Sequence, residues 1–216
     1  MNKRNPLIGL LKYSFFSMNG SLVLVILVGL SLGILSIFIE YYVIYVAFLP
    51  LVVFGGPAHI IMSKSEMTSK WEQFQVSMPI KRKDIATVPY IIILLALLSG
   101  IPVSTLISVI HFVLRENTMD FLMRSFANTF LIVGTVLLTA ALFYPFAYTK
   151  FGNRSRKGLG FVCLIVAALV NLLIILGGKG LLISDGVIAL LNIAISGSAF
   201  IISLFVAREI YTKIDF

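Results

Sequence analysis

Charged side chains are scarce in this chain. Of its 216 residues, 12% are Asp, Glu, Lys or Arg and 59% are apolar, whereas a soluble domain has about 25% charged and about 45–50% apolar residues. This balance excludes an ordinary soluble domain. Because each membrane-crossing helix needs roughly 20 apolar residues, the length predicts one domain of about six transmembrane helices. The sequence therefore indicates an all-α integral membrane protein.

Cysteine is nearly absent as well. The single Cys163 excludes a disulfide within the chain. It lies inside an apolar run, where a cysteine behaves as a small packing residue. We therefore expect a buried thiol without a reactive role.

The chain also lacks the motifs of catalysis, metal binding and nucleotide binding. It contains no HExxH, no Cys/His cluster, no GxSxG and no GxxxxGK[ST]. His59 and His111 fall at opposite ends of their expected spans, roughly 30 Å apart, so they cannot share a metal ion. We expect no catalytic residue, no metal and no cofactor in this chain.

Ionisable groups are missing from the centres of the expected spans, and Glu40 and Asp185 lie at span edges. Ion-coupled carriers usually keep such groups within the membrane, because a charge there is costly and is retained for function. This absence argues against an ion-coupled secondary transporter, although that alternative stays open.

Six apolar segments predict the spans. They cover about residues 21–39, 42–62, 85–114, 126–148, 159–176 and 187–207. The last four are separated by loops expected at 115–124, 149–158 and 177–186. We expect Asp84 to be the N-cap of the third span, and Gly100 with Pro102 to break that span in its middle.

The basic residues predict the orientation. Of the 17 Lys and Arg residues, only Arg115, Arg124 and Lys179 fall on the side opposite the N-terminus. The rule that cytoplasmic loops carry the excess of Lys and Arg places both termini in the cytoplasm. The net charge of +8 then faces anionic headgroups of the bilayer, so no nucleic-acid partner is needed to explain it.

The longest polar interval, residues 63–84, lies between the second and third spans. Over 63–78, an amphipathic helix places Met67, Trp71, Phe74 and Met78 on one narrow face. Pro79 ends it, and the cations Lys81, Arg82 and Lys83 follow. This helix could lie on lipid, pack on the chain's own spans, or dock on a cytoplasmic partner. Glu66 and Glu72 favour the partner, because anionic lipid would repel them. A second amphipathic stretch, 5–20, predicts an interface helix before the first span.

Two amides stand out inside the last two expected spans. Asn171 and Asn192 either form hydrogen bonds between helices or line a translocation path. The sequence leaves both alternatives open.

Two motifs resemble ABC-2-type permeases. Residues 70–85, KWEQFQVSMPIKRKDI, resemble the cytoplasmic segment between spans 2 and 3 of small members of that family. Residues 144–152, YPFAYTKFG, resemble the family's motif after span 4. Within the family, the pattern is most similar to the transmembrane subunits of the staphylococcal exporters of phenol-soluble modulins, with bacteriocin-immunity permeases close to it.

The resemblance implies a function and a set of partners. The chain would be the permease of an ATP-driven exporter in a bacterial plasma membrane, paired with a second permease chain, like or unlike. A separate ATPase subunit would bind ATP and Mg²⁺, and the cargo would be an amphipathic peptide or a related lipid-soluble toxic compound. Helix 63–78 would be the coupling helix. The implied ATPase-coupling residues are Met67, Trp71, Glu72, Phe74, Met78, Pro79, Lys81, Arg82, Lys83 and Asp84. Other classes that remain open are a membrane-embedded immunity or scaffold protein and an ion-coupled secondary transporter.

Overall fold

The structure is a computed structural model that describes residues 9, 81–115, 118–147 and 153–213. The expected interface helix 5–20, the spans 21–39 and 42–62, and the expected coupling helix 63–78 lie outside the described residues. The described chain is helical, with α6 over Arg82–Arg115, α7 over Met119–Ala147, α8 over Asn153–Gly180 and α9 over Asp185–Lys213. These helices overlap the last four expected spans.

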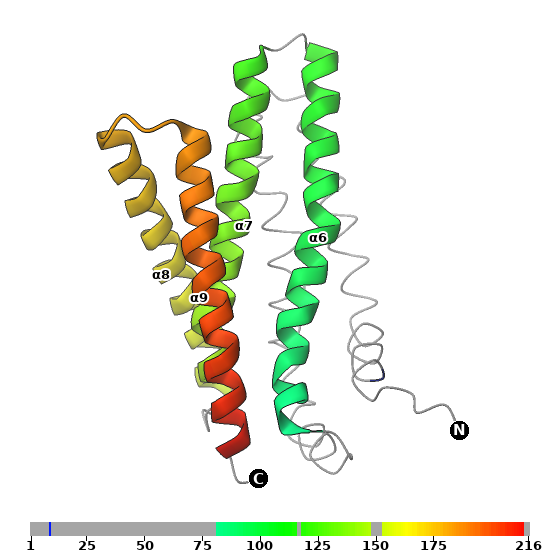
Figure 1. The fold of residues 1–216 in the computed structure, drawn as a ribbon, viewed down its shortest axis with the longest axis vertical. Helices are drawn as coiled ribbons and strands as arrows, with labels where there is room; N and C mark the ends of the chain where they lie inside the picture. Colours follow the sequence, from blue (N-terminus) through cyan, green and yellow to red (C-terminus); the bar gives the residue numbers. More distant parts are fainter. Residues whose placement is uncertain (1–8, 10–80, 116–117, 148–152, 214–216) are drawn as a thin grey trace.

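The four helices form an upright bundle whose chain direction alternates from one helix to the next (Figure 1). Consequently α6 and α8 begin at the end of the bundle where α7 and α9 finish. Helices α7 and α9 each contact all of the other three helices and contact each other most extensively, so this pair is the centre of the described bundle. Helices α6, α7 and α9 are each long and apolar enough to cross a membrane, and α8 contributes a shorter apolar helix, Ile165–Gly180.

The bundle carries its apolar side chains outside as well as inside. On α9 the buried face follows a helical repeat of small and polar residues that includes Asn192, Ser196, Ser203 and Ala207. The exposed faces of the same helix carry large apolar groups such as Leu190, Ile202 and Phe205. In water this distribution would be unfavourable. In lipid it is the expected one, because helices associate through small residues and hydrogen bonds while apolar side chains face the acyl chains.

Helix α6 is continuous through both of its prolines, Pro89 and Pro102, so the predicted break at Gly100 and Pro102 is wrong. Proline removes one backbone hydrogen bond, but hydrocarbon offers no water to any further opened backbone group. Because the helix continues on both sides of Pro102, only one backbone carbonyl loses its helical hydrogen bond. The Thr105 Oγ1 also donates to the Pro102 carbonyl at 2.8 Å.

The connections are shorter than the sequence suggests. The predicted loop 115–124 is largely helical, because α6 extends to Arg115 and α7 begins at Met119. The Thr118 carbonyl accepts the Phe121 N–H at 3.0 Å and so starts the helix before its charged residues. Likewise α8 begins at Asn153, within the loop expected at 149–158. Charges near a span therefore mark helix ends that project beyond the hydrocarbon, and do not mark loops.

The connection between α8 and α9 is a single turn at residues 181–184. The Ile183 N–H donates to the Gly178 carbonyl at 3.0 Å and the Leu182 N–H to the Lys179 carbonyl at 3.1 Å, which together form a Schellman motif. Leu182 takes the left-handed position with φ of 55°, where glycine is usual. The turn leaves no room for a re-entrant helix between α8 and α9.

Candidate functional site

The start of α6 holds the part of the predicted coupling site that the structure describes. Lys81 and Lys83 are exposed, and Arg82 and Asp84 are half-buried. The Lys81 carbonyl accepts the Asp84 N–H at 2.8 Å, so Lys81 is the N-cap and the prediction that Asp84 caps the helix is wrong. Asp84 lies instead in the first turn, where its negative charge is favourable next to the positive end of the helix dipole.

The other predicted coupling residues lie outside the described part of the chain. They are Met67, Trp71, Glu72, Phe74, Met78 and Pro79. Their expected face therefore stays a prediction, and the described geometry begins at Lys81.

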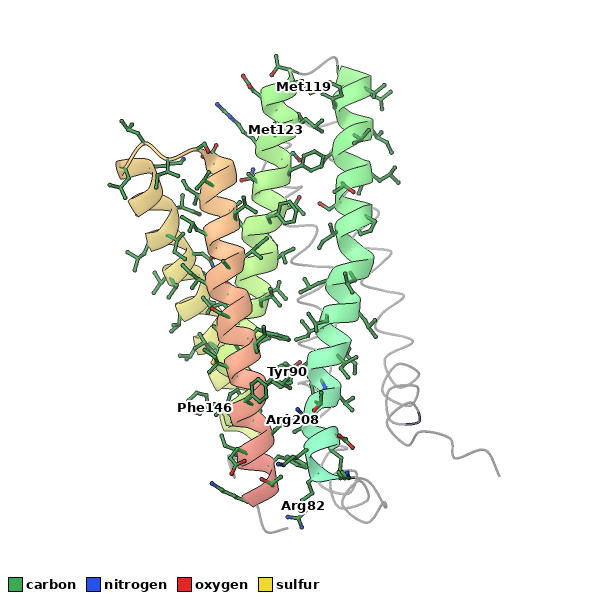
Figure 2. All side chains as sticks on the ribbon, in the orientation of Figure 1. Arg82, Tyr90, Met119, Met123, Phe146 and Arg208 are labelled. Carbon is green, nitrogen blue, oxygen red and sulfur yellow. The ribbon has the colours of Figure 1, made fainter. Side chains whose placement is uncertain are left out.

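Tyr90, two turns into α6, joins three helices. Its side chain is 1% exposed, and its ring lies 4.9 Å from that of Tyr144 on α7 and 5.0 Å from that of Phe200 on α9. Its hydroxyl lies 2.9 Å from the Ser203 Oγ and 3.1 Å from the Ser203 carbonyl oxygen. Ser203 Oγ in turn donates to the Ala141 carbonyl at 2.6 Å. This aromatic and hydroxyl cluster lies toward the end of the bundle that carries Arg82 (Figure 2).

Two hydroxyl pairs join the other halves of α6 and α7. Ser104 Oγ lies 3.1 Å from Thr129 Oγ1, and Ser108 Oγ lies 2.7 Å from Ser125 Oγ. Ser108 also donates to the Ser104 carbonyl and Thr129 to the Ser125 carbonyl. Each hydroxyl has one proton, so Ser125 must donate to Ser108, and Ser104 to Thr129. All four protons are used, and all four side chains are buried.

Asn192 joins α9 to α7. Its Nδ2 donates to the Leu131 carbonyl at 3.0 Å, which is the interhelical bond that one of the two sequence alternatives expects. Gly134 makes this contact close, because a Cβ there would overlap the Asn192 side chain. Since Asn192 meets Leu131 and Ser203 meets Ala141, α7 and α9 run parallel through the bundle.

Asn171 differs from Asn192. Its Nδ2 donates to the Ala167 carbonyl of its own helix at 2.9 Å. Its Oδ1 is buried and has no hydrogen-bond partner among the described residues. The structure thus does not bring the two predicted path residues together in one hydrogen-bonded group.

Sequence reasoning missed the Tyr90 cluster and the hydroxyl pairs. The pairs left a detectable signal, because Ser104 and Ser108 are four residues apart, as are Ser125 and Thr129. Hydroxyls at that spacing share a helix face, and such residues are frequent at helix contacts in membranes. Tyr90 and Ser203 are 113 residues apart, and no local pattern connects them.

The described bundle is that of a membrane-embedded helical protein with a hydrogen-bonded interior. The chain belongs to the ABC-2 family transporter proteins, whose family model matches residues 9–212. It is therefore the membrane permease component of an ABC transporter, a non-catalytic part that works with an ATPase partner and usually as a dimer. Comparison with curated proteins gave no match, and comparison with solved structures gave none.

Proposed function

We propose that this permease belongs to an exporter that moves amphipathic peptides, of the phenol-soluble modulin type, or related lipid-soluble toxic compounds out of a bacterial cell. A separate ATPase subunit binds ATP and Mg²⁺ and docks on helix 63–78 and the start of α6. A second permease chain, like or unlike, completes the transporter. The single observation that carries the permease role and the ATPase partner is the family match over residues 9–212; the cargo and the direction of transport rest on the resemblance of residues 70–85 and 144–152.

The charge distribution of the described bundle supports the orientation, with the start of α6 in the cytoplasm. Lys81 is the N-cap of α6, and Arg82 and Lys83 are its first residues. Arg208 and Lys213 lie in the last part of α9, at the same end of the bundle (Figures 1 and 2). The opposite end holds only Arg115, Arg124 and Lys179 among the described Lys and Arg residues. Excess Lys and Arg mark the cytoplasmic side.

The composition of the described spans supports transport driven by ATP over transport driven by an ion gradient. The described stretches 85–114, 125–147 and 186–207 contain no Asp, Glu, Lys or Arg. Ion-coupled carriers usually keep ionisable groups within the membrane. Asn171 and Asn192 are the buried amides of the described residues, and we propose that substrate passes near them.

The first test is a pull-down of the tagged chain from its native host in mild detergent. We expect an ATPase subunit to co-purify with the wild type and to be lost from the Trp71→Ala/Glu72→Ala variant. Arg124→Ala, at the other end of the bundle, is the matched control and should retain the ATPase.

Two other results point to a different class of protein, and a third points to a different docking site for the ATPase. If no ATPase co-purifies with any form while the chain still protects cells, the chain is an immunity or scaffold protein. If transport stops with an uncoupler at full ATP, the chain is an ion-coupled carrier. If the double variant keeps the ATPase, helix 63–78 is not its docking site.

A further inference from the structure

The largest fully buried side chain in the described part of the chain is Tyr90, and donor counting fixes its role. Ser203 Oγ uses its only proton on the Ala141 carbonyl. The Tyr90 hydroxyl is therefore the donor to Ser203, shared between Oγ at 2.9 Å and the carbonyl oxygen at 3.1 Å. A single chain of hydrogen bonds thus runs from α6 through α9 to α7.

The position of Tyr90 along α6 makes this chain of bonds mechanically relevant. Tyr90 is nine residues after Lys81, about 13 Å along a helix that rises 1.5 Å per residue. It directly follows Pro89, whose missing N–H leaves the Ile85 carbonyl without its helical donor. The helix backbone is weakened at this point, so a displaced first turn would bend there unless the next residue is held.

Tyr90 is held on two sides. Its ring packs between Tyr144 of α7 and Phe200 of α9, and its hydroxyl is bonded to α9. Packed interiors resist continuous deformation, so a displacement of Tyr90 must move these neighbours with it.

We propose that Tyr90, Ser203 and the Ala141 carbonyl form a joint, the Tyr90 joint, that passes a movement of the start of α6 to α7 and α9. Tyr90 and Ser203 are positioning residues in this scheme, because they contact neither nucleotide nor substrate. The inference rests on the proposed function, in which an ATPase acts on the segment that leads into α6.

Tyr144 supplies a matched control within the same aromatic cluster. Its ring contacts Tyr90, but its buried hydroxyl has no hydrogen-bond partner among the described residues. Tyr90→Phe and Tyr144→Phe therefore remove the same atom from the same cluster, and only the first removes a bond between helices. Ser203→Ala is the second test variant, since it removes the bond to Ala141 without altering the aromatic contacts.

The experiment follows movement at two exposed positions, Lys83 at the start of α6 and Lys213 at the end of α9. The only cysteine is replaced (Cys163→Ala), and an environment-sensitive fluorophore is attached after Lys83→Cys or Lys213→Cys. The permease, co-purified with its ATPase, is measured without nucleotide and with Mg²⁺ and a non-hydrolysable ATP analogue.

In the otherwise wild-type chain we expect both positions to respond to the nucleotide. In Tyr90→Phe, Lys83→Cys should still respond, while the response of Lys213→Cys falls about fivefold or more, the size of an ordinary coupling between sites. In Ser203→Ala the fall at Lys213→Cys should be smaller, because the Tyr90 hydroxyl keeps its bond to the backbone carbonyl of residue 203. In Tyr144→Phe both responses should persist. If Tyr90 and Ser203 had only a packing role, substituting them would change the fluorescence measured without nucleotide. The response to nucleotide would then change by the same factor at Lys83→Cys and at Lys213→Cys.

The remaining outcomes separate the two proposals. If Lys213→Cys responds fully in Tyr90→Phe and Ser203→Ala, or never responds in the wild type, the joint is overturned while the ATPase drive stands. If Lys83→Cys gives no response in the wild type, the proposed ATPase drive fails, and the joint fails with it.

Discussion

Gly134 offers the sharpest test of how α7 and α9 pack. A Cβ at this position would overlap Nδ2 of Asn192 and lie 2.8 Å from its Cγ. The backbone of α7 and the side chain of Asn192 are both held, the latter by its bond to the Leu131 carbonyl. Gly134→Ala must therefore displace Asn192, break that bond, or separate the two helices.

The expected cost follows from three contributions. Overpacking a filled interior costs about 1–3 kcal/mol, and a lost hydrogen bond between membrane helices costs on average about 0.6 kcal/mol. Alanine stabilises a helix by about 1 kcal/mol relative to glycine. The net destabilisation is thus roughly 0.6–2.6 kcal/mol, which corresponds to about 1–10 °C in Tm for a chain of this size.

Gly197→Ala on α9 is the matched control, because nothing lies within 4 Å of a Cβ built there. It keeps the gain in helix propensity without the clash, so its Tm should rise by about 2–4 °C. The difference between the two variants isolates the packing cost at Gly134.

The chain carries its own reporter for this measurement. Cys163 is the only cysteine and is 6% exposed, so a thiol-reactive fluorogenic dye reports its exposure as the detergent-solubilised protein is heated. If Gly134→Ala melts at or above the temperature of Gly197→Ala, Gly134 does not meet Asn192, and the packing of α7 on α9 is other than described.

Two further predictions concern the ends of helices. Leu182→Gly should raise Tm by about 2–8 °C, because Leu182 is 95% exposed and has φ of 55°, a conformation that costs a non-glycine residue roughly 1–2 kcal/mol. Leu181→Gly in the same turn should give no such rise in the dye assay. Lys213→Ala should leave the Tm almost unchanged, since its 3.2 Å ion pair with Glu209 joins side chains that are 73% and 61% exposed, and such pairs contribute about 0.3–0.5 kcal/mol. A fall of several degrees would show that Lys213 has another partner.

The helical character of the described part could be predicted from the apolar runs, but the helix ends and continuity could not. Pro102 and Gly100 suggested a break, because the rule for proline describes helices whose freed carbonyls can bind water. Charged residues near Asp120 predict a loop, because in a membrane protein charge usually lies outside the hydrocarbon, whereas Asp120 lies in the first turn of α7. In a membrane helix, both features are compatible with continued hydrogen bonding.

The described part of the candidate site could likewise be predicted from the sequence only in part. The basic run at Lys81–Lys83 was visible in the sequence, and so were the two buried amides. The sequence could not show which helix each amide bonds to. Asn192 donates to the Leu131 carbonyl, 61 residues away, whereas Asn171 donates to the Ala167 carbonyl of its own helix. Contacts of this kind depend on the order of helices in the bundle.

The two hydroxyl pairs have a consequence for assembly. Ser104 and Ser108 are one turn apart on α6, and Ser125 and Thr129 are one turn apart on α7, so the two helices meet in full only in one register. A slip by one turn would keep a single pair and leave two hydroxyls facing hydrocarbon, which is unfavourable. Helices that insert into the bilayer separately and associate later can slide along apolar faces at little cost. The hydroxyl pairs thus stabilise one register of α6 against α7 over the others that apolar packing alone would allow.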